Sequence, residues 1–426
     1  MPSPALGGFL PSGLGKVPAF VLTGAMACAA LAFAADRVAK EQASGDVHVF
    51  WQAGYDYLHG NNLYETRPGL LSFIYPPFAA LFFVPLGALP FKVAAFLFFV
   101  GNYLLWYFTF VWIVKALRPF EDNASMPWVI GLTFLATFKL FLNNLTTIQV
   151  NNYVFLPALI AVYCFLKGRD TAAIALAGLA TSIKLTPVLL FFWMLVRRPT
   201  ARFWGSCLLA AAMFVAVPAV LRGPSQGVND IRDYYKTFLS VFVEGGVNVN
   251  NSNQNLVGTI LRYCTDVSGP AGDNDGHTFH IVDCDPSSVR VAGRLLSITL
   301  LVGVVLSSIA QARAGVPPNL YEASAYLLTG HLVAGCTWKA HLVTLALPLA
   351  LIASDIFSGR KQSLWLKLLF GCFCGLGMLG KEIVGKQAIM FINAYGFYTI
   401  GMVLIVLTFL ILPLQKQGSA APSAAD

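Results

Sequence analysis

The best candidate for a catalytic base lies in the polar loop that follows the first long apolar run. Asp46 is followed in this loop by His48 and Trp51. The aromatic residues suit a helix that lies along a membrane surface. A carboxylate half buried at such a surface has a raised pKa, so it could accept the proton of a hydroxyl group. The alternative is an ordinary solvated aspartate.

A lysine lies inside a long apolar segment. Lys184 stands within residues 171–196 and is followed by Leu185, Thr186 and Pro187. An ionisable residue at that depth is costly unless it faces a cavity or a partner. At a break between two half-helices, it could bind a phosphate that reaches in from headgroup depth. The alternative is a lysine that extends to the interface or is neutralised by a helix carbonyl.

Two amide-rich stretches could complete a binding site. One is the polar turn at residues 143–152, and the other is the run at residues 250–255. Their side chains could hydrogen-bond sugar hydroxyls or a diphosphate, although asparagine is also common in ordinary loops. The candidates within them are Gln149, Asn151 and Asn253.

The histidines carry weaker signals. His341 follows Trp338 at the start of an apolar run, and a lone histidine at a helix end is usually structural. The chain has no GxxxxGK[ST] loop, no HExxH motif and no zinc-type spacing of cysteine and histidine. His277 and His280 lie near three aspartates and could bind a divalent cation, but an exposed polar loop explains them more simply. We therefore expect no metal and no cofactor.

The composition is that of a polytopic membrane protein. Of 426 residues, 57% are hydrophobic and 11% are charged, against about 25% charged in soluble domains. A spanning helix needs about 20 apolar residues, and the chain predicts about 11 to 12 such segments. The runs are residues 17–35, 92–117, 127–142, 153–167, 171–196, 203–221, 289–313, 320–337, 341–354, 364–380 and 387–413. The net charge of +8 does not indicate nucleic acid as a partner, because the basic residues are scattered at helix ends.

We expect a single all-α membrane domain over residues 1–418. It would include external loops at residues 36–75 and 222–288, with a juxtamembrane helix in the first of them. Residues 419–426 are small and polar, which is typical of a disordered tail. The first apolar run could instead be a cleaved signal peptide, because residues 32–34 resemble a cleavage site. The many later spans need no separate export signal.

The eight cysteines do not indicate a disulfide scaffold. Six of them lie in apolar runs, where a small buried residue is ordinary. Cys264 and Cys284 lie in the long polar loop and could form a bridge in an oxidising compartment. Two free thiols are the alternative.

Charge distribution predicts the topology. Lysine and arginine concentrate in cytoplasmic loops, whereas the loop at residues 36–75 carries three basic against five acidic residues and should be external. All basic clusters lie on the cytoplasmic side of the membrane only if two conditions hold. Residues 76–90 must not cross fully, and residues 171–196 must be two half-helices that turn near Pro187. The polar candidates would then converge on the outer face.

Together these segments resemble the polyprenyl-phosphate-sugar-dependent glycosyltransferases of the GT-C superfamily, specifically glycosyltransferase family 87. Four motifs in order carry the resemblance. They are residues 46–60 with Tyr75-Pro76-Pro77, residues 148–151 (Ile-Gln-Val-Asn), residues 177–187 ending in Ile-Lys-Leu-Thr-Pro, and residues 338–341 (Trp-Lys-Ala-His). One position departs from the pattern, because family members often have adjacent histidines where this chain has Ala340 and His341.

The resemblance implies a GT-C-type helical fold and a role for each candidate. Asp46 would be the catalytic base, with His341 in the site, and Lys184 would hold the lipid phosphate. Arginines such as Arg262 or Arg290 could share the phosphate charge. The residues implied in substrate binding are Lys184, Gln149, Asn151, Tyr75, Asn253, Arg262 and Trp338.

The resemblance also implies the substrates. The donor would be a polyprenyl-phosphate monosaccharide, with mannose favoured, and the acceptor a lipid or glycan. Transfer would invert the anomeric carbon at the extracytoplasmic face of the plasma membrane. Two alternatives stay open. A secondary transporter of a polar or lipid-linked solute should show inverted repeats, which the sequence lacks. The other is a non-catalytic envelope assembly protein.

Overall fold

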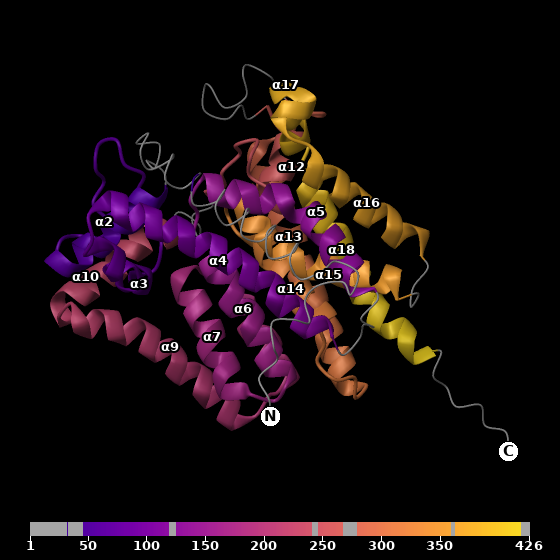
Figure 1. Ribbon diagram of the computed structural model, residues 1–426, viewed down its shortest axis with the longest axis horizontal. Coiled ribbons are helices and arrows are strands. Elements are labelled where there is room, and N and C mark those ends of the chain that lie inside the picture. The colour runs from indigo at the N-terminus through magenta and orange to yellow at the C-terminus, as the bar shows by residue number, and fades with distance from the viewer. Residues whose placement is uncertain are drawn as a thin grey trace.

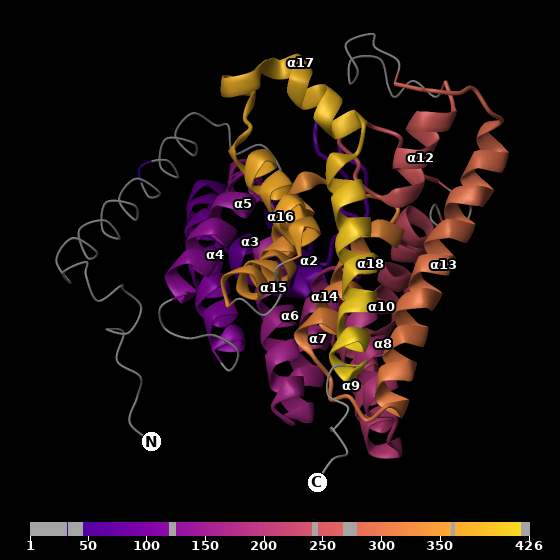
Figure 2. The same ribbon diagram turned by 90° about the vertical axis from the view of Figure 1, so that its right-hand side faces the viewer.

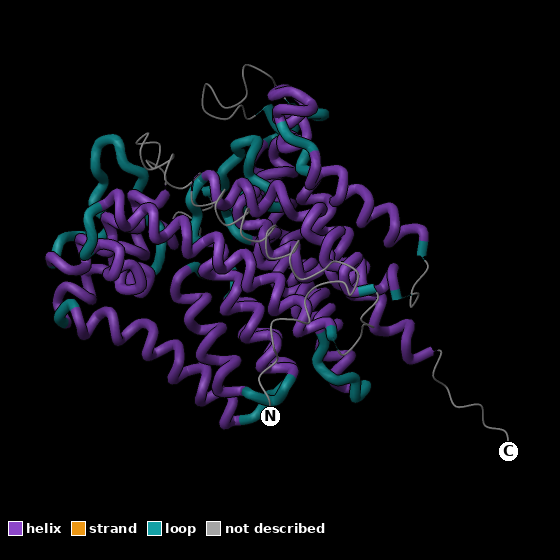
Figure 3. The backbone as a smooth tube through the Cα atoms, in the orientation of Figure 1, coloured by secondary structure: helices purple, strands orange, loops and turns teal. Residues whose placement is uncertain are grey.

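The structure is a computed structural model that describes residues 46–118, 125–240, 246–266, 279–358 and 363–418, together with residue 32. The described residues form helices joined by turns and loops, with no strand among them (Figure 3). The expected all-α architecture is confirmed. The first apolar run, apart from one residue, His277 and the C-terminal tail lie outside the described residues.

The helices follow one another along the chain, and most of them are labelled in Figure 1, with α8 labelled in Figure 2. The first nine are α2 (Asp46–His59), α3 (Pro77–Gly87), α4 (Phe91–Leu117), α5 (Met126–Thr146), α6 (Asn151–Leu166), α7 (Asp170–Ile183), α8 (Val188–Arg197), α9 (Ala201–Leu221) and α10 (Pro224–Tyr234). They are followed by η2 (Tyr235–Leu239), α12 (Leu256–Cys264), α13 (Pro286–Arg313), α14 (Leu320–Val333), η3 (Lys339–Leu345), α15 (Ala346–Phe357), α16 (Leu364–Met378), α17 (Lys381–Ala394) and α18 (Phe397–Gly418).

The apolar helices fall into two length classes. Within the described residues, five are long and apolar enough to cross a bilayer, namely α4, α5, α9, α13 and the continuous η3–α15 segment. The bent pair α17–α18, with 48° between its parts, makes a sixth if it is one span. The apolar helices α3, α6, α7, α8 and α16 have only 10–17 residues. The chain is thus a multi-pass membrane protein. Within the described residues, fewer helices reach full spanning length than the run lengths predict, because the runs at residues 171–196 and 387–413 are broken and α6 and α16 are short.

The segment between α6 and α9 is a hairpin of two half-helices. α7 ends at Ile183, Lys184 is extended with φ −152° and ψ 131°, and α8 begins at Val188. Asp170, the first residue of α7, forms an ion pair with Arg198, which follows α8. The two outer ends of the hairpin therefore meet, and the turn predicted near Pro187 is confirmed.

Helix α14 covers this turn. A Cβ atom on Gly330 would lie 2.8 Å from the carbonyl oxygen of Thr186, so a residue with a side chain could not approach so closely. A broken helix at membrane depth is tolerated where protein buries it or where it lines a cavity. Gly330 therefore permits the packing that supports the backbone on either side of Pro187.

Helices α2 and α3 pack tightly against each other in the first polar region. A Cβ on Gly54 would lie 2.2 Å from the Phe83 carbonyl oxygen, and one on Gly87 would lie 2.1 Å from the Tyr55 nitrogen. α3 has 11 residues, which is roughly 16 Å of helix. It is therefore too short to cross a bilayer, as the charge distribution predicts.

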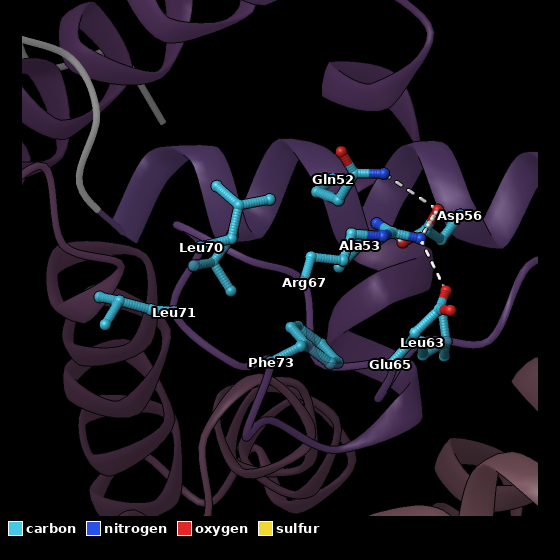
Figure 4. Close-up of a pocket in the computed structure, with 10 residues that line it drawn as sticks. Gln52, Ala53, Asp56, Leu63, Glu65, Arg67, Leu70, Leu71 and Phe73 are labelled. Carbon is cyan, nitrogen blue, oxygen red and sulfur yellow. Dashed lines mark hydrogen bonds and ion pairs between the residues drawn. The ribbon is translucent and has the colours of Figure 1, made fainter.

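A buried carboxylate fixes the loop that follows α2. Arg67 donates from both terminal nitrogens to Asp56, at 2.7 and 3.0 Å. The amides of Gln52 and Asn61 each donate to the same carboxylate at 3.0 Å. Figure 4 shows Gln52, Asp56 and Arg67 of this cluster beside a cavity of about 20 Å³, which is room for about one water molecule. The cluster therefore supports the helix that carries Asp46 and is too small to hold a sugar.

The short basic connections lie at one end of the bundle. The α6–α7, α8–α9 and α13–α14 connections share that end, and α12 and α17 lie at the other (Figures 1 and 2). The residues in these connections or next to them are Lys167, Arg169, Arg198, Arg202 and Arg313. Their common location agrees with the predicted grouping of basic clusters on one side. Which side faces the cytoplasm stays a prediction.

The two loop cysteines lie near each other as free thiols. The amide of Cys284 donates to the carbonyl oxygen of Cys264 at 2.8 Å. The backbone thus brings both residues to the same place, at the C-terminal end of α12. The structure contains no bridge between them.

Candidate active site

Lys184 lies at the centre of a polar cluster. Its ammonium nitrogen is 2.8 Å from Asn151 Oδ1 and 2.8 Å from His341 Nε2. The ring of Tyr75 lies beneath it, with 5.8 Å between the nitrogen and the ring centroid. The turn between α7 and α8 supplies the lysine, the start of α6 supplies the amide, and η3 supplies the imidazole. Four segments far apart in the sequence therefore meet at one cation.

A chain of amides fixes the orientation of Asn151. Asn151 donates to Asn144 Oδ1 at 3.0 Å, and Asn144 donates to Asn102 Oδ1 at 3.1 Å. Asn102 in turn donates to the carbonyl oxygen of Gln149 at 2.9 Å. Each amide thus donates to one neighbour and accepts from the next, so its oxygen and nitrogen cannot exchange places. Asn151 is left with its oxygen directed at Lys184.

The turn between α5 and α6 is strained next to this chain. Ile148 has φ 51°, a conformation that costs a β-branched residue about 1–3 kcal/mol. The following residue, Gln149, is partly buried, and its Oε1 has no hydrogen-bond partner. The unpartnered oxygen agrees with a role for Gln149 in binding a hydroxyl group.

Asp46 is the first residue of α2 and is half buried. It is close enough to Lys184 and Tyr75 for electrostatic interaction with both. Burial raises the pKa of the Asp46 carboxyl, and the charge of Lys184 partly opposes this rise. Phe50, one turn along α2, is fully buried against Phe83 and so anchors the helix. A carboxylate and an ammonium therefore face the same small region.

His341 has contacts on both ring nitrogens. The amide of Trp338 donates to Nδ1 at 3.3 Å, and Lys184 lies at Nε2. A neutral imidazole that accepts at Nδ1 carries its proton on Nε2, where it would donate to an uncharged amine. An ammonium at Lys184 requires the other tautomer. That tautomer carries its proton on Nδ1, facing the Trp338 amide, so His341 accepts from an ammonium at Lys184 only by giving up the hydrogen bond from Trp338.

Two predicted binding residues lie in the supporting layer. Asn253 is buried, accepts from the amide of Thr337 at 2.8 Å and donates to the carbonyl oxygen of Gly335 at 3.4 Å. Arg262 donates to the carbonyl oxygens of Ala394 and Asn250, both at 2.9 Å. The bonds of Asn253 hold the segment before Trp338, and those of Arg262 hold the C-terminal end of α12. The structure thus brings together Asp46, Tyr75, Asn151, Lys184 and His341, with Gln149 and Trp338 beside them, and places Asn253 and Arg262 behind.

Asn102 and His331 are absent from the sequence-based candidates, and Asn144 is among them only as part of the polar turn at residues 143–152. Asn102 and Asn144 carry the amide chain, and His331 of α14 lies with its ring centroid 6.4 Å from that of His341. All three are buried within apolar helices. Polar residues inside such helices mark functional sites often enough to be candidates on that ground alone.

The site shows no arrangement for a metal. Among the residues that the structure describes, no three histidine, cysteine, aspartate or glutamate side chains gather as possible ligands. His280 lies 3.5 Å from the carboxylate of Asp266 instead. That the reaction needs no metal or cofactor stays a prediction.

A large apolar cavity adjoins the polar cluster. It has a volume of about 520 Å³ and lies among α3, α7, α8, α9 and α10. Pro76 and Pro77, which follow Tyr75, line it on one side, and Ser182 and Leu185 line it next to Lys184. The rest of its wall includes Phe78, Phe191, Phe192, Trp204, Leu208 and Phe214, and none of the described residues that line it is charged. The cavity is suited to a hydrocarbon chain.

Comparisons with known proteins agree with this arrangement. The model of glycosyltransferase family 87 matches residues 73–335. A polyprenol-phosphate-mannose-dependent alpha-(1-2)-phosphatidylinositol mannoside mannosyltransferase of Mycobacterium tuberculosis is 26% identical over 332 residues, which cover 75% of this chain and 70% of the relative. A polyprenol-phosphate-mannose-dependent alpha-(1-2)-phosphatidylinositol pentamannoside mannosyltransferase of Mycolicibacterium smegmatis is 33% identical over 169 residues, 39% of this chain and 38% of the relative. No solved structure matches the chain.

The family match covers part of the cluster. Tyr75, Asn151 and Lys184 lie within residues 73–335, whereas Asp46 precedes that range and His341 follows it. The contacts of Lys184 therefore join matched residues to residues outside the match. The roles of Asp46 and His341 depend on the geometry of this chain.

Proposed function

The chain belongs to glycosyltransferase family 87, and on that premise we propose that it transfers mannose from a polyprenyl-phosphate donor to a hydroxyl group of a lipid or glycan acceptor. It is a membrane glycosyltransferase that uses a polyprenyl-phosphate-linked sugar. The choice of mannose, the acceptor, inversion at the anomeric carbon and the extracytoplasmic location of the site are parts of the proposal. Mannose is favoured because the relatives are mannosyltransferases by name.

The position of Lys184 carries the proposal, because the lysine adjoins residues that line the apolar cavity and interacts electrostatically with Asp46. A polyprenyl phosphate has a long hydrocarbon chain and an anionic head. The cavity of about 520 Å³ holds the hydrocarbon chain. The ammonium of Lys184, next to the lining residues Ser182 and Leu185, donates hydrogen bonds to the phosphate. The sugar attached to that phosphate would then lie against the face that Asp46 and Asn151 form.

The reaction follows from these positions. Asp46 accepts the proton of the acceptor hydroxyl as its oxygen attacks the anomeric carbon. The bond between that carbon and the phosphate oxygen breaks, and the electron pair leaves with the phosphate. The leaving group thereby gains a second negative charge, which Lys184 stabilises. Attack from the face opposite the phosphate inverts the anomeric carbon.

Transfer by the purified chain tests the proposal. In lipid nanodiscs, it should move radiolabelled mannose from polyprenyl phosphate mannose to a phosphatidylinositol mannoside, and should not use a nucleotide-linked mannose. The anomeric configuration of the new linkage, measured by NMR, should be opposite to that of the donor. Retained configuration would disprove inversion, and transfer only from the nucleotide sugar would disprove the choice of donor.

The proposed orientation predicts which surfaces are accessible from outside the cell. In a cysteine-free background, single cysteines at Glu65 and Ile281 should react with a membrane-impermeant thiol reagent on intact cells. Cysteines at Lys167 and Arg313 should not react, because these residues lie at the basic end of the bundle. All four side chains are exposed, so burial does not limit the reaction. Labelling at Lys167 and Arg313 with protection at Glu65 and Ile281 would reverse the orientation.

A further inference from the structure

A second groove lies beside the segment that joins α14 to η3. It has a volume of about 210 Å³ and lies among α12, α13 and the end of α14. Figure 2 shows α12 beside the outer part of α13. Val257, Arg294, Ile298, Leu301, Val333 and Gly335 are among its lining residues. We call it the α12–α13 groove. Unlike the apolar cavity, it includes a charged side chain.

Two arginines on α13 have no partner within the described residues. Arg290 and Arg294 are four residues apart and so lie on the same face of the helix. Neither forms an ion pair or hydrogen bond with another described residue, and Arg290 Nε is buried without a partner. Arg294 lines the groove, and Arg290 lies one turn before it. Arg290, considered from the sequence as a residue for the donor phosphate, thus has no hydrogen bond or ion pair with the polar cluster. Burying an unpartnered charged donor is costly. A bound oxyanion would satisfy it, because the guanidinium geometry matches phosphate oxygens.

The arginines lie where a lipid headgroup would be found. α13 begins at Pro286 after the long polar loop, and Arg290 and Arg294 occupy its second and third turns. Leu301 follows Arg294 by seven residues, or roughly 10 Å along the helix. A phosphate held by the arginines would thus place a hydrocarbon chain beside Ile298 and Leu301. Charged residues followed by apolar residues along α13 match the headgroup and the acyl chain of a phospholipid that enters from the bilayer.

The chain between α14 and η3 connects this groove to the polar cluster. Gly335 lines the groove, and the next residue, Cys336, is within electrostatic range of Lys184. Asn255 donates to the Ala334 carbonyl oxygen at 2.7 Å and so fixes this segment. A headgroup held at the groove could therefore reach the reacting atoms.

We propose that the α12–α13 groove binds the acceptor as an anionic glycerophospholipid that carries the glycan to be extended. Arg290 and Arg294 hold its phosphodiester, and one acyl chain lies along Ile298 and Leu301. The inference rests on the proposed glycosyl transfer, since it assigns the acceptor to a groove that shares no lining residue with the apolar cavity of the donor. The two lipids would occupy separate spaces and meet at the cluster.

Lipid binding without catalysis is the first test. Native mass spectrometry of the purified chain in detergent would be used to titrate phosphatidylinositol, with diacylglycerol of the same chains as the uncharged comparison. The double variant Arg290→Gln/Arg294→Gln should weaken phosphatidylinositol binding by at least about tenfold and leave diacylglycerol binding unchanged. Leu301→Trp should weaken both, because it fills the groove.

Two substitutions on the same helix serve as matched controls. Arg313→Gln removes a charge at the far end of α13, and Leu306→Trp adds an indole at an exposed position that does not line the groove. Both should bind phosphatidylinositol within about twofold of wild type. Equal phosphatidylinositol affinity in the wild type, the double variant and Leu301→Trp would overturn the proposal. A loss of polyprenyl phosphate binding instead of phosphatidylinositol binding in Leu301→Trp would assign the groove to the donor and overturn it as well.

Transfer to a soluble mannoside separates this inference from the proposed function. A short soluble acceptor needs no acyl-chain groove, so the double variant should match wild type with it and should lose activity only with the phospholipid acceptor. Equal rates with both acceptors would refute the groove while the glycosyltransferase stands. A wild-type chain that releases no sugar from polyprenyl phosphate would refute the proposed function, and phosphatidylinositol binding would still decide the groove.

Discussion

Asp46→Asn will lower the turnover of sugar transfer by about 100-fold or more, which is the usual contribution of a general base. The amide has nearly the shape of the carboxylate but cannot accept the proton of the acceptor. Asp46 is half buried at the first turn of α2 and faces the same region as Lys184. Because the change conserves volume, thermal stability and donor affinity should stay near wild type. Steady-state transfer by the purified variant measures the effect.

A second carboxylate in the same loop provides the control. Glu65 is exposed and interacts only weakly with Arg67, at 3.5 Å. Glu65→Gln should therefore keep nearly full activity. Transfer by Asp46→Asn at more than about a tenth of the wild-type rate would be too fast for loss of a general base and would remove Asp46 from the mechanism.

The pH dependence of wild-type activity checks the same residue. Burial raises the pKa of Asp46 above the ordinary value of 3.8, with Lys184 opposing the rise. A base acts only when deprotonated, so kcat/KM should fall as the pH drops through this raised pKa. The acidic limb should therefore lie above pH 3.8. An acidic limb at the value of a solvated aspartate would contradict the buried environment.

The broken hairpin shows what charge and proline content can predict. Basic residues on both sides of residues 171–196 required an even number of crossings, and Pro187 marked where the chain could turn. The ion pair between Asp170 and Arg198 confirms that both ends return to one place. The even number of crossings also predicts that Asn151 and His341 approach Lys184, because it directs the turn toward the side of the membrane on which these two residues are expected.

Other features depend on packing that no local pattern contains. Hydropathy gives the length of an apolar run but not whether it folds as one helix, so the described residues contain fewer full-length spans than the run lengths predict. The amide chain needs Asn102 of α4 to meet Asn144 of α5, which depends on how these two helices are rotated. Arg262 is similar, because its sequence context does not reveal that Ala394 accepts from its guanidinium. The sequence could supply candidates there, but not their partners.

Lys184→Ala will weaken donor binding far more than acceptor binding. A hydrogen bond to a charged group contributes about 1.5–3 kcal/mol, so the donor Kd should rise roughly 10- to 100-fold. The acceptor makes no bond to this ammonium in the proposed reaction, so its affinity should change little. Lys184→Arg should restore part of the donor affinity, because it keeps the charge but not the compact head that fits between Asn151 and His341. Titration of each lipid substrate against the purified variants measures both affinities.

Lys184→Met separates loss of charge from loss of packing. Methionine keeps an unbranched side chain over the ring of Tyr75 but cannot bind a phosphate. If the charge matters, the methionine and alanine variants should lose donor affinity equally. If Lys184 serves only to connect Asn151 with His341, both variants should lose thermal stability and bind the donor as wild type does. Lys167→Ala removes an exposed lysine at the far end of α6 and should change neither property, so a donor-specific loss at Lys184 alone would mark it as the phosphate-binding residue.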